Sequence, residues 1–222
     1  TPTRRQRQMC IRDRSDTVAN ITSIDALTTT EVTMAGATVS ITDTGASKAQ
    51  VDTVNGFTTG TVTPTSISED KADITTLQGT TGISLATTNI TVTDQVNKSE
   101  ADTINGYTTG QVVLNSASMT VTELAAVEAL NDSVMKFADD GAISVSDAAS
   151  LSDANTINNY TTGQVTLTSV DDTVANITSI DGLTTTQVSM AAATVSITDT
   201  GASKTQVDTV NGFTTGTVTP TS

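Results

Sequence analysis

Four aspartates recur at one place in the sequence pattern, and their carboxylates are the groups of this chain best suited to bind a ligand. They lie seven or eight residues before a repeated ten-residue segment and are Asp43, Asp94, Asp147 and Asp199. Carboxylate oxygens are preferred ligands of Ca²⁺, so such a row could hold calcium between repeats. An Asp at a strand-to-helix turn is also a common helix cap. The sequence contains no EF-hand loop and no glycine-rich calcium nonapeptide. We keep calcium as the alternative to a structural role and predict no other cofactor.

Few other residues have side chains and spacing suited to catalysis or to ligand binding. The chain has no His and a single cysteine, and it contains no G-x-S-x-G, P-loop or dinucleotide fingerprint. Adjacent acids occur at 69–70, 139–140 and 171–172, but neighbours in sequence form an acid/base pair only if the fold converges them. The sequence therefore predicts no catalytic residue and no enzyme. Alternating threonines at 61–63 and 217–219 are typical of ice-binding surfaces and equally of an ordinary strand face.

The elements that position these residues are tandem repeats. The ten-residue segment reads VDTVNGFTTG at 51–60, ADTINGYTTG at 101–110, ANTINNYTTG at 154–163 and VDTVNGFTTG at 207–216, so the period is 50 to 53 residues. Residues 15–66 and 171–222 align without gaps and differ at six positions. A period in this range indicates a stacked repeat architecture. We predict one tandem-repeat array over residues 15–222 and expect that the parent protein continues beyond both ends.

Each repeat is predicted to hold two half-repeats of about 25 residues, each a strand followed by a short helix. Residues 37–43 alternate apolar and polar side chains, as a half-buried strand does. Ser47 followed three residues later by Gln50 is a capping-box pattern that begins a helix, and it recurs at Asn97/Glu100, Ser150/Asp153 and Ser203/Gln206. Gly56 and its counterparts Gly106, Asn159 and Gly212 are expected to end that helix in the left-handed conformation.

The second half-repeat continues the pattern. Its strand is predicted from residues 61, 111 and 164, and Pro64 should end the first of these strands because proline donates no ladder hydrogen bond. Its short helix is predicted at VANITSI from Val18 and from Val174, at KADITTL from Lys71 and at LAAVEAL from Leu124. Helix crossovers join parallel strands, so we predict an α/β solenoid with a parallel sheet and short helices. The alternative is an all-β array of small modules.

Residues 1–14 differ from the rest. Residues 4–14, RRQRQMCIRDR, resemble a translated sequencing adapter and contain all five arginines and the only cysteine. We predict that residues 1–14 are non-native, disordered and packed on nothing. The remaining residues, 15–222, carry a net charge of −18. This charge disfavours nucleic-acid and anionic-membrane partners, and no apolar run reaches the length of a membrane span.

The ITVTD, ADTINGYTTG and ELAAVEAL segments resemble the Thr/Ala/Asp-rich tandem repeats of very large bacterial cell-surface and secreted proteins. The resemblance covers residues 15–222. It implies an extracellular or cell-surface location and a non-catalytic role as spacer, stalk or adhesion surface, and it supplies no ligand residues. The partner that we expect is the protein's own further repeats, by self-stacking. The competing classes are a calcium-dependent binding module and, less favoured, an ice-binding or polysaccharide-active solenoid.

Overall fold

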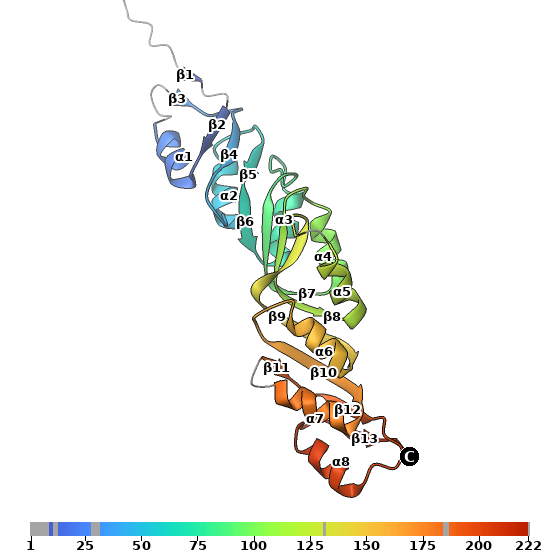
Figure 1. Ribbon diagram of the computed structural model, residues 1–222. Helices are drawn as coiled ribbons and strands as arrows, with labels where there is room; N and C mark the ends of the chain where they lie inside the picture. The colour runs from blue at the N-terminus through green and yellow to red at the C-terminus, as the bar shows by residue number, and fades with distance from the viewer. Residues whose placement is uncertain (1–8, 11–12, 28–31, 131, 184–186, 222) are drawn as a thin grey trace, which may run out of the picture. The chain divides into compact units, whose positions relative to one another are not determined.

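The structure, a computed structural model, alternates short strands and short helices (Figure 1). It describes residues 9–10, 13–27, 32–130, 132–183 and 187–221. The helices in these residues are α1 (Val18–Asp25), α2 (Lys48–Asn55), α3 (Lys71–Gly79), α4 (Lys98–Asn105), α5 (Val121–Glu128), α6 (Leu151–Asn158), α7 (Val174–Gly182) and α8 (Lys204–Asn211). The strands are β1 (Met9–Cys10), β2 (Asp13–Asp16), β3 (Val32–Thr33), β4 (Thr38–Ile41), β5 (Val62–Pro64), β6 (Ser66–Glu69), β7 (Asn89–Val96), β8 (Val112–Met119), β9 (Met135–Ala149), β10 (Val165–Asp172), β11 (Val188–Ser189), β12 (Thr194–Ile197) and β13 (Val218–Pro220). We name each half-repeat by its helix.

Local sequence sets where the helices begin, and the predicted capping boxes are confirmed. The Ser47 hydroxyl accepts a hydrogen bond from the Gln50 N–H at 3.3 Å, and Gln50 Oε1 accepts one from the Ser47 N–H at 2.8 Å. The same reciprocal bonds join the other three predicted pairs. The helices α1, α3, α5 and α7 are also confirmed, although α5 begins at Val121, three residues earlier than predicted, behind a Thr120–Glu123 capping box.

The predicted left-handed helix ends are wrong. Gly56, Asn159 and Gly212 have φ of −69°, −85° and −74°, all right-handed. The Gly56 N–H is shared between the carbonyls of Asp52 and Thr53, at 3.0 and 3.2 Å. The last turn therefore tightens, and the chain leaves the helix without needing a positive φ.

Strand order follows the repeat, and each strand pair with a defined register is parallel. The predicted effect of Pro64 is confirmed, because β5 ends at this residue and β6 begins at Ser66. Where Leu114 and Leu167 stand in the same place, β8 and β10 run unbroken for eight residues each. The chain is thus α/β with parallel strands, and the all-β alternative is wrong.

The chain divides into two compact units, and the single tandem-repeat array over 15–222 stays a prediction. Unit 1 holds residues 1–93 and 103–112, and unit 2 holds residues 94–102 and 113–222. In unit 1, β4 lies between β2 and β5, β1 pairs with β3, and β6 pairs with β7. In unit 2 the strand order is β13-β12-β10-β9-β8, and β11 also pairs with β10.

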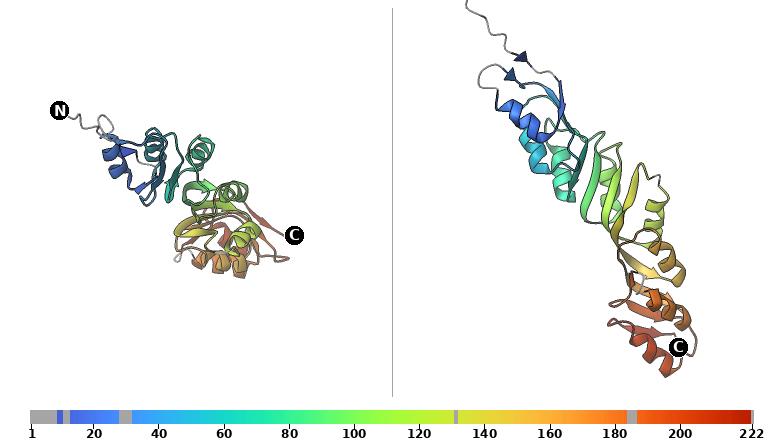
Figure 2. Two further views of the ribbon diagram at one scale, coloured as in Figure 1. Left: turned by 90° about the horizontal axis from the view of Figure 1, so that it is seen from above. Right: turned by 60° about the vertical axis from the view of Figure 1, so that its left-hand side comes forward.

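Each unit has a thin aliphatic core between its strands and its helices. Successive helices pack side by side, α1 on α2 in unit 1 and α6 on α7 on α8 in unit 2 (Figure 2). The strand residues Val39 and Ile41 and the helix residues Val51 and Val54 are fully buried. Val39 and Ile41 are two residues apart on a strand, and Val51 and Val54 are three apart on a helix. Each pair therefore lies on one face of its element, and the two faces pack together in one layer.

Residues 9–10 and 13–14 pair with strands, contrary to the expectation that residues 1–14 pack on nothing, whereas their non-native origin stays a prediction. Met9–Cys10 pairs with Val32–Thr33, and Asp13–Arg14 pairs with Thr38–Val39, both in parallel. The same registers, 156 residues on, join β10 to β11 and to β12. The segment therefore takes the strand position of the repeat, which needs only backbone hydrogen bonds to an otherwise open edge. Residues 1–8 and 11–12 lie outside the described residues.

Candidate functional site

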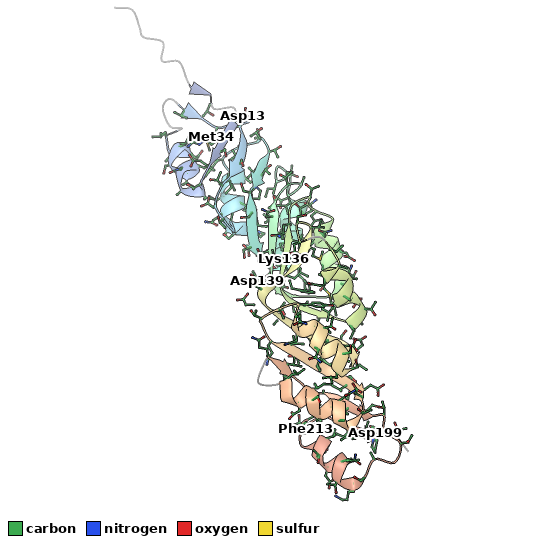
Figure 3. The ribbon with its side chains drawn as sticks, in the orientation of Figure 1. Asp13, Met34, Lys136, Asp139, Asp199 and Phe213 are labelled. Atoms are coloured by element: carbon green, nitrogen blue, oxygen red, sulfur yellow. The ribbon has the colours of Figure 1, made fainter. Side chains whose placement is uncertain are left out.

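Three of the four predicted aspartates cap a helix of the preceding half-repeat. Asp43 Oδ2 accepts the Val18 N–H at 2.7 Å, and Asp147 Oδ1 accepts the Val121 N–H at 2.8 Å. Asp199, labelled in Figure 3, accepts the Val174 N–H at 2.6 Å through Oδ2. Each carboxylate thus meets the first N–H of a helix 25 or 26 residues earlier. An anion there is stabilised by the unpaired N–H groups and by the helix dipole.

The structure does not bring the predicted aspartates together. Asp94, the fourth, is half-buried within β7. Among the described residues, no group of three or more His, Cys, Asp or Glu side chains is placed to hold a metal ion. Asp43, Asp147 and Asp199 act one at a time, each at its own helix.

Sequence reasoning missed two further members of this row. Glu69 Oε1 accepts the Lys48 N–H at 2.5 Å, and Asp172 Oδ2 accepts the Leu151 N–H at 2.9 Å. Partial burial alone would raise the pKa of Asp172, but hydrogen bonds from Leu151, Asn176 and Thr173 outweigh it and lower that pKa below its usual value. The signal in the sequence is that an acid stands near the end of the strand in these half-repeats too, as it does before the ten-residue segment.

The repeated Thr-Thr-Gly also joins neighbouring half-repeats, a role that the sequence analysis did not predict. The first Thr is buried or half-buried, and its hydroxyl donates to a carbonyl 20 or 21 residues earlier; the bonds are Thr58 to Ala37, Thr108 to Thr88, Thr161 to Gly141 and Thr214 to Ala193, at 2.6 to 2.7 Å. The same hydroxyl accepts the N–H of the following Gly. One hydroxyl therefore both closes the turn and ties it to the previous half-repeat.

The glycine of this motif is fixed by close backbone approach. A Cβ at Gly60, Gly110, Gly163 or Gly216 would lie closer than 3.0 Å to a carbonyl oxygen of the previous half-repeat. The second Thr adds another bond, since Thr109, Thr162 and Thr215 donate to the carbonyls of Ala86, Asp139 and Ala191. Thr-Thr-Gly is therefore a contact motif between half-repeats.

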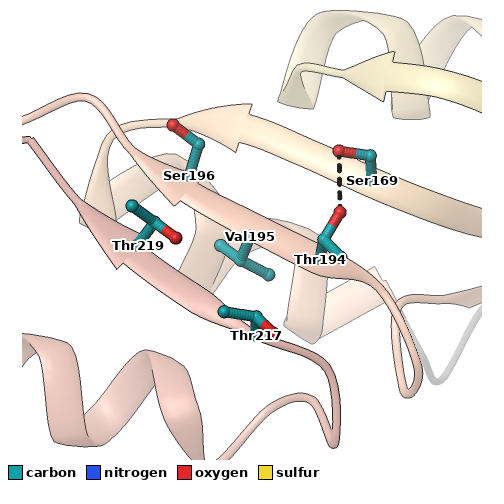
Figure 4. A pocket seen from close by; sticks show the side chains of 6 residues that line it. All are labelled: Ser169, Thr194, Val195, Ser196, Thr217 and Thr219. Atoms are coloured by element: carbon teal, nitrogen blue, oxygen red, sulfur yellow. Dashed lines mark hydrogen bonds between the residues drawn. The ribbon is translucent and has the colours of Figure 1, made fainter.

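A shallow hollow on unit 2 is lined mainly by hydroxyl groups (Figure 4). Thr194 Oγ1 donates to Ser169 Oγ at 3.1 Å, and Ser196 pairs in register with Thr219. Thr217, part of the threonine array noted in the sequence, also lines the hollow. The surface offers donors and acceptors at strand spacing, and its lining holds no titratable group.

A second hollow lies around Tyr160 and Asp139. Tyr160 stacks on Phe137 with ring centroids 6.2 Å apart. Asp139 forms an ion pair at 3.4 Å with Lys136, and both residues are labelled in Figure 3. Burial raises the pKa of Tyr160, and the charge of Glu128 adds to that effect. The aromatic ring thus serves packing near the end of α6.

No protein-family model, curated protein or solved structure matches this chain. In the part of the chain that the structure describes, we find no helix with both the length and the apolar character needed to cross a membrane.

Proposed function

We propose that this chain is a non-catalytic repeat region, an α/β solenoid that acts as a spacer or interaction surface in a large extracellular or cell-surface protein. One observation carries the proposal. All four copies of Thr-Thr-Gly and five of the strand-end acids bond to residues 20 to 26 positions earlier, which means to the adjacent half-repeat. Conserving neighbour contacts while leaving the rest variable is how a stacked array is built.

The surface chemistry supports the same role. The whole chain carries a net charge of −14, its core is thin, and its one cysteine lies in the adapter-like segment. The resemblance to tandem repeats of bacterial surface proteins adds the proposed location. An extracellular array without disulfides would derive its stability from the contacts between half-repeats.

Small-angle X-ray scattering tests the solenoid. In a chain whose residues 169–221 are duplicated in tandem, two added parallel strands should lengthen the particle by about 10 Å. The cross-sectional radius should stay unchanged. A control chain with a Gly/Ser extension of equal length should broaden the distance distribution without a fixed increment. If the duplicated chain instead grows equally in all directions, the solenoid proposal is wrong.

Antibodies raised against residues 15–222 test the location. They should label intact cells of the source organism, and brief protease treatment of those cells should remove the signal. Labelling only after the cells are broken would contradict a surface role.

A further inference from the structure

One of the four repeats departs from the others around the hollow beside Tyr160. The second Thr of Thr-Thr-Gly donates to the Ala86 carbonyl in one copy and to the Ala191 carbonyl in another, whereas in a third it donates to the Asp139 carbonyl. Asp139 therefore stands where these two repeats have alanine. Asn159 likewise stands where the other three ten-residue segments have glycine. Both residues line the hollow.

An aromatic pair lies beside these two substitutions. Phe137 is the one aromatic residue outside the ten-residue segments, and its ring stacks on that of Tyr160 with the ring planes 8° from parallel. Phe137 is buried, whereas Tyr160 both packs on it and lines the hollow. Packing between half-repeats does not require an acid at position 139, since two other repeats pack with alanine there. The changes of one repeat gather at one hollow, which favours a binding role for it.

The surroundings of the hollow are negatively charged. The Asp139 side chain is 91% exposed, so its ion pair with Lys136 is a surface pair that contributes little to stability (Figure 3). Burial raises the pKa of Tyr160, and the charge of Glu128 raises it further. Burial also raises the pKa of Glu128, and the charge of Asp132 adds to that effect. A cation beside Tyr160 is favoured by the same charges that disfavour its phenolate.

Two groups of the lining are suited to a ligand that brings hydrogen-bond donors. The Asp139 carboxylate only accepts hydrogen bonds, and Asn158 Oδ1 is buried without a partner among the described residues. The hydroxyls of Thr161 and Thr162 already donate to backbone carbonyls. The hollow has a volume of about 370 Å³, at the small end of the range for ligand sites. It therefore suits a side chain or a small molecule that carries N–H donors and a positive charge.

We propose that this hollow binds the guanidinium group of an arginine side chain on a partner peptide. A guanidinium is planar, carries five N–H donors, stacks on aromatic rings and pairs with carboxylates through two hydrogen bonds. It lies against Tyr160 and pairs with Asp139, where it displaces the Lys136 ammonium group. A neutral saccharide gains nothing from the negative charge. The inference deepens the proposed role as an interaction surface, and its test depends on neither the solenoid nor the location of the protein.

Tyrosine fluorescence tests the site. The chain has two tyrosines and no Trp, so Tyr107→Phe leaves Tyr160 as the only tyrosine. Phenylalanine already stands at the equivalent positions 57 and 213. Titration of this variant with the peptide acetyl-Gly-Arg-Gly-amide should change the Tyr160 emission saturably, with a Kd on the order of 1 mM. Added NaCl should weaken the binding by screening. The peptide with citrulline, which is neutral and nearly isosteric with arginine, should give no saturable change.

Asp139→Ala in the same background should raise the Kd for the arginine peptide about five- to tenfold. The fold should tolerate this change, because Ala86 and Ala191 occupy the same place in other repeats. Asp140→Asn is the matched control, since it removes an equal charge from the adjacent exposed residue, which does not line the hollow. It should change the Kd by less than about twofold.

Three results overturn the proposal. The first is the absence of a saturable response to the arginine peptide, or an equal response to the citrulline peptide. The second is an equal loss of affinity in Asp139→Ala and Asp140→Asn, which would mean general attraction between opposite charges. The third is a response to methyl glucoside with none to the arginine peptide, which would mark a saccharide site. Scattering on the same variants keeps the solenoid test separate.

Discussion

The Asp172 carboxylate accepts a hydrogen bond from the Leu151 N–H at 2.9 Å, and this bond connects β10 to the first turn of α6. The two residues are 21 positions apart and belong to successive half-repeats. Glu69 accepts the Lys48 N–H and Asp199 accepts the Val174 N–H, so the arrangement recurs. The N-termini of α1, α2, α5, α6 and α7 are therefore each capped twice, once by the helix's own Ser or Thr and once by a neighbour's acid.

Asp172→Asn should alter how stability depends on pH. The folded-state pKa of Asp172 is lowered, so the carboxylate stabilises the fold fully above its unfolded pKa of about 3.9. That contribution is lost as the pH falls through the lower folded-state pKa. Urea denaturation should show a deficit of about 1 kcal/mol for Asp172→Asn at pH 7, shrinking towards pH 2 to 3. The exposed neighbour Asp171 is the control, and Asp171→Asn should show no such deficit.

Gly163→Ala should destabilise the protein by about 1–3 kcal/mol, because its Cβ would press on the carbonyls of Asp140 and Gly141. Gly182→Ala, at the end of α7, is the matched control, since nothing lies within 4 Å of the added Cβ. That change should be neutral or slightly stabilising. Thermal unfolding of the two variants measures the difference, and equal losses would contradict the contact role of Thr-Thr-Gly.

Arg14→Val should stabilise the protein by about 1 kcal/mol. Arg14 occupies the position against Val39 that Val170, fully buried, occupies against Val195. Its buried Nε has no hydrogen-bond partner among the described residues. Asp13→Ser, which restores the residue found at position 169, should change little because Asp13 is exposed. A loss of stability in Arg14→Val would mean that the ion pair with Asp16 outweighs burial of the valine.

Calcium and magnesium should raise the melting temperature equally at matched ionic strength. One oxygen of each of Asp43, Asp147 and Asp199 accepts a helix N–H, so the expected effect of either ion is screening of the negative charge. Differential scanning calorimetry in millimolar CaCl₂ and MgCl₂ measures it. A shift with Ca²⁺ alone that disappears in Asp43→Asn/Asp199→Asn would restore the calcium alternative.

The sequence by itself determined the features that depend on neighbours a few residues away. The Ser47–Gln50 capping box fixes the start of α2, and Pro64 ends β5 because it lacks a donor. The repeat period likewise predicted parallel strands with short helices. These interactions are local, so the order of residue types is enough to specify them.

Only the tertiary structure decided what the recurring residues do. Asp43 was compatible with calcium or with a local turn, and it proves to cap α1, 25 residues earlier. Gly56 does not need a left-handed φ, whereas Gly60 is required by the carbonyl of Ala37. Arg14 lies in a strand although residues 4–14 differ in composition from the repeats. The open edge of β4 supplies backbone hydrogen-bond partners to any strand in register. Each outcome depends on which backbone lies beside a residue after half-repeats pack, and the spacing of residues along the chain does not contain that information.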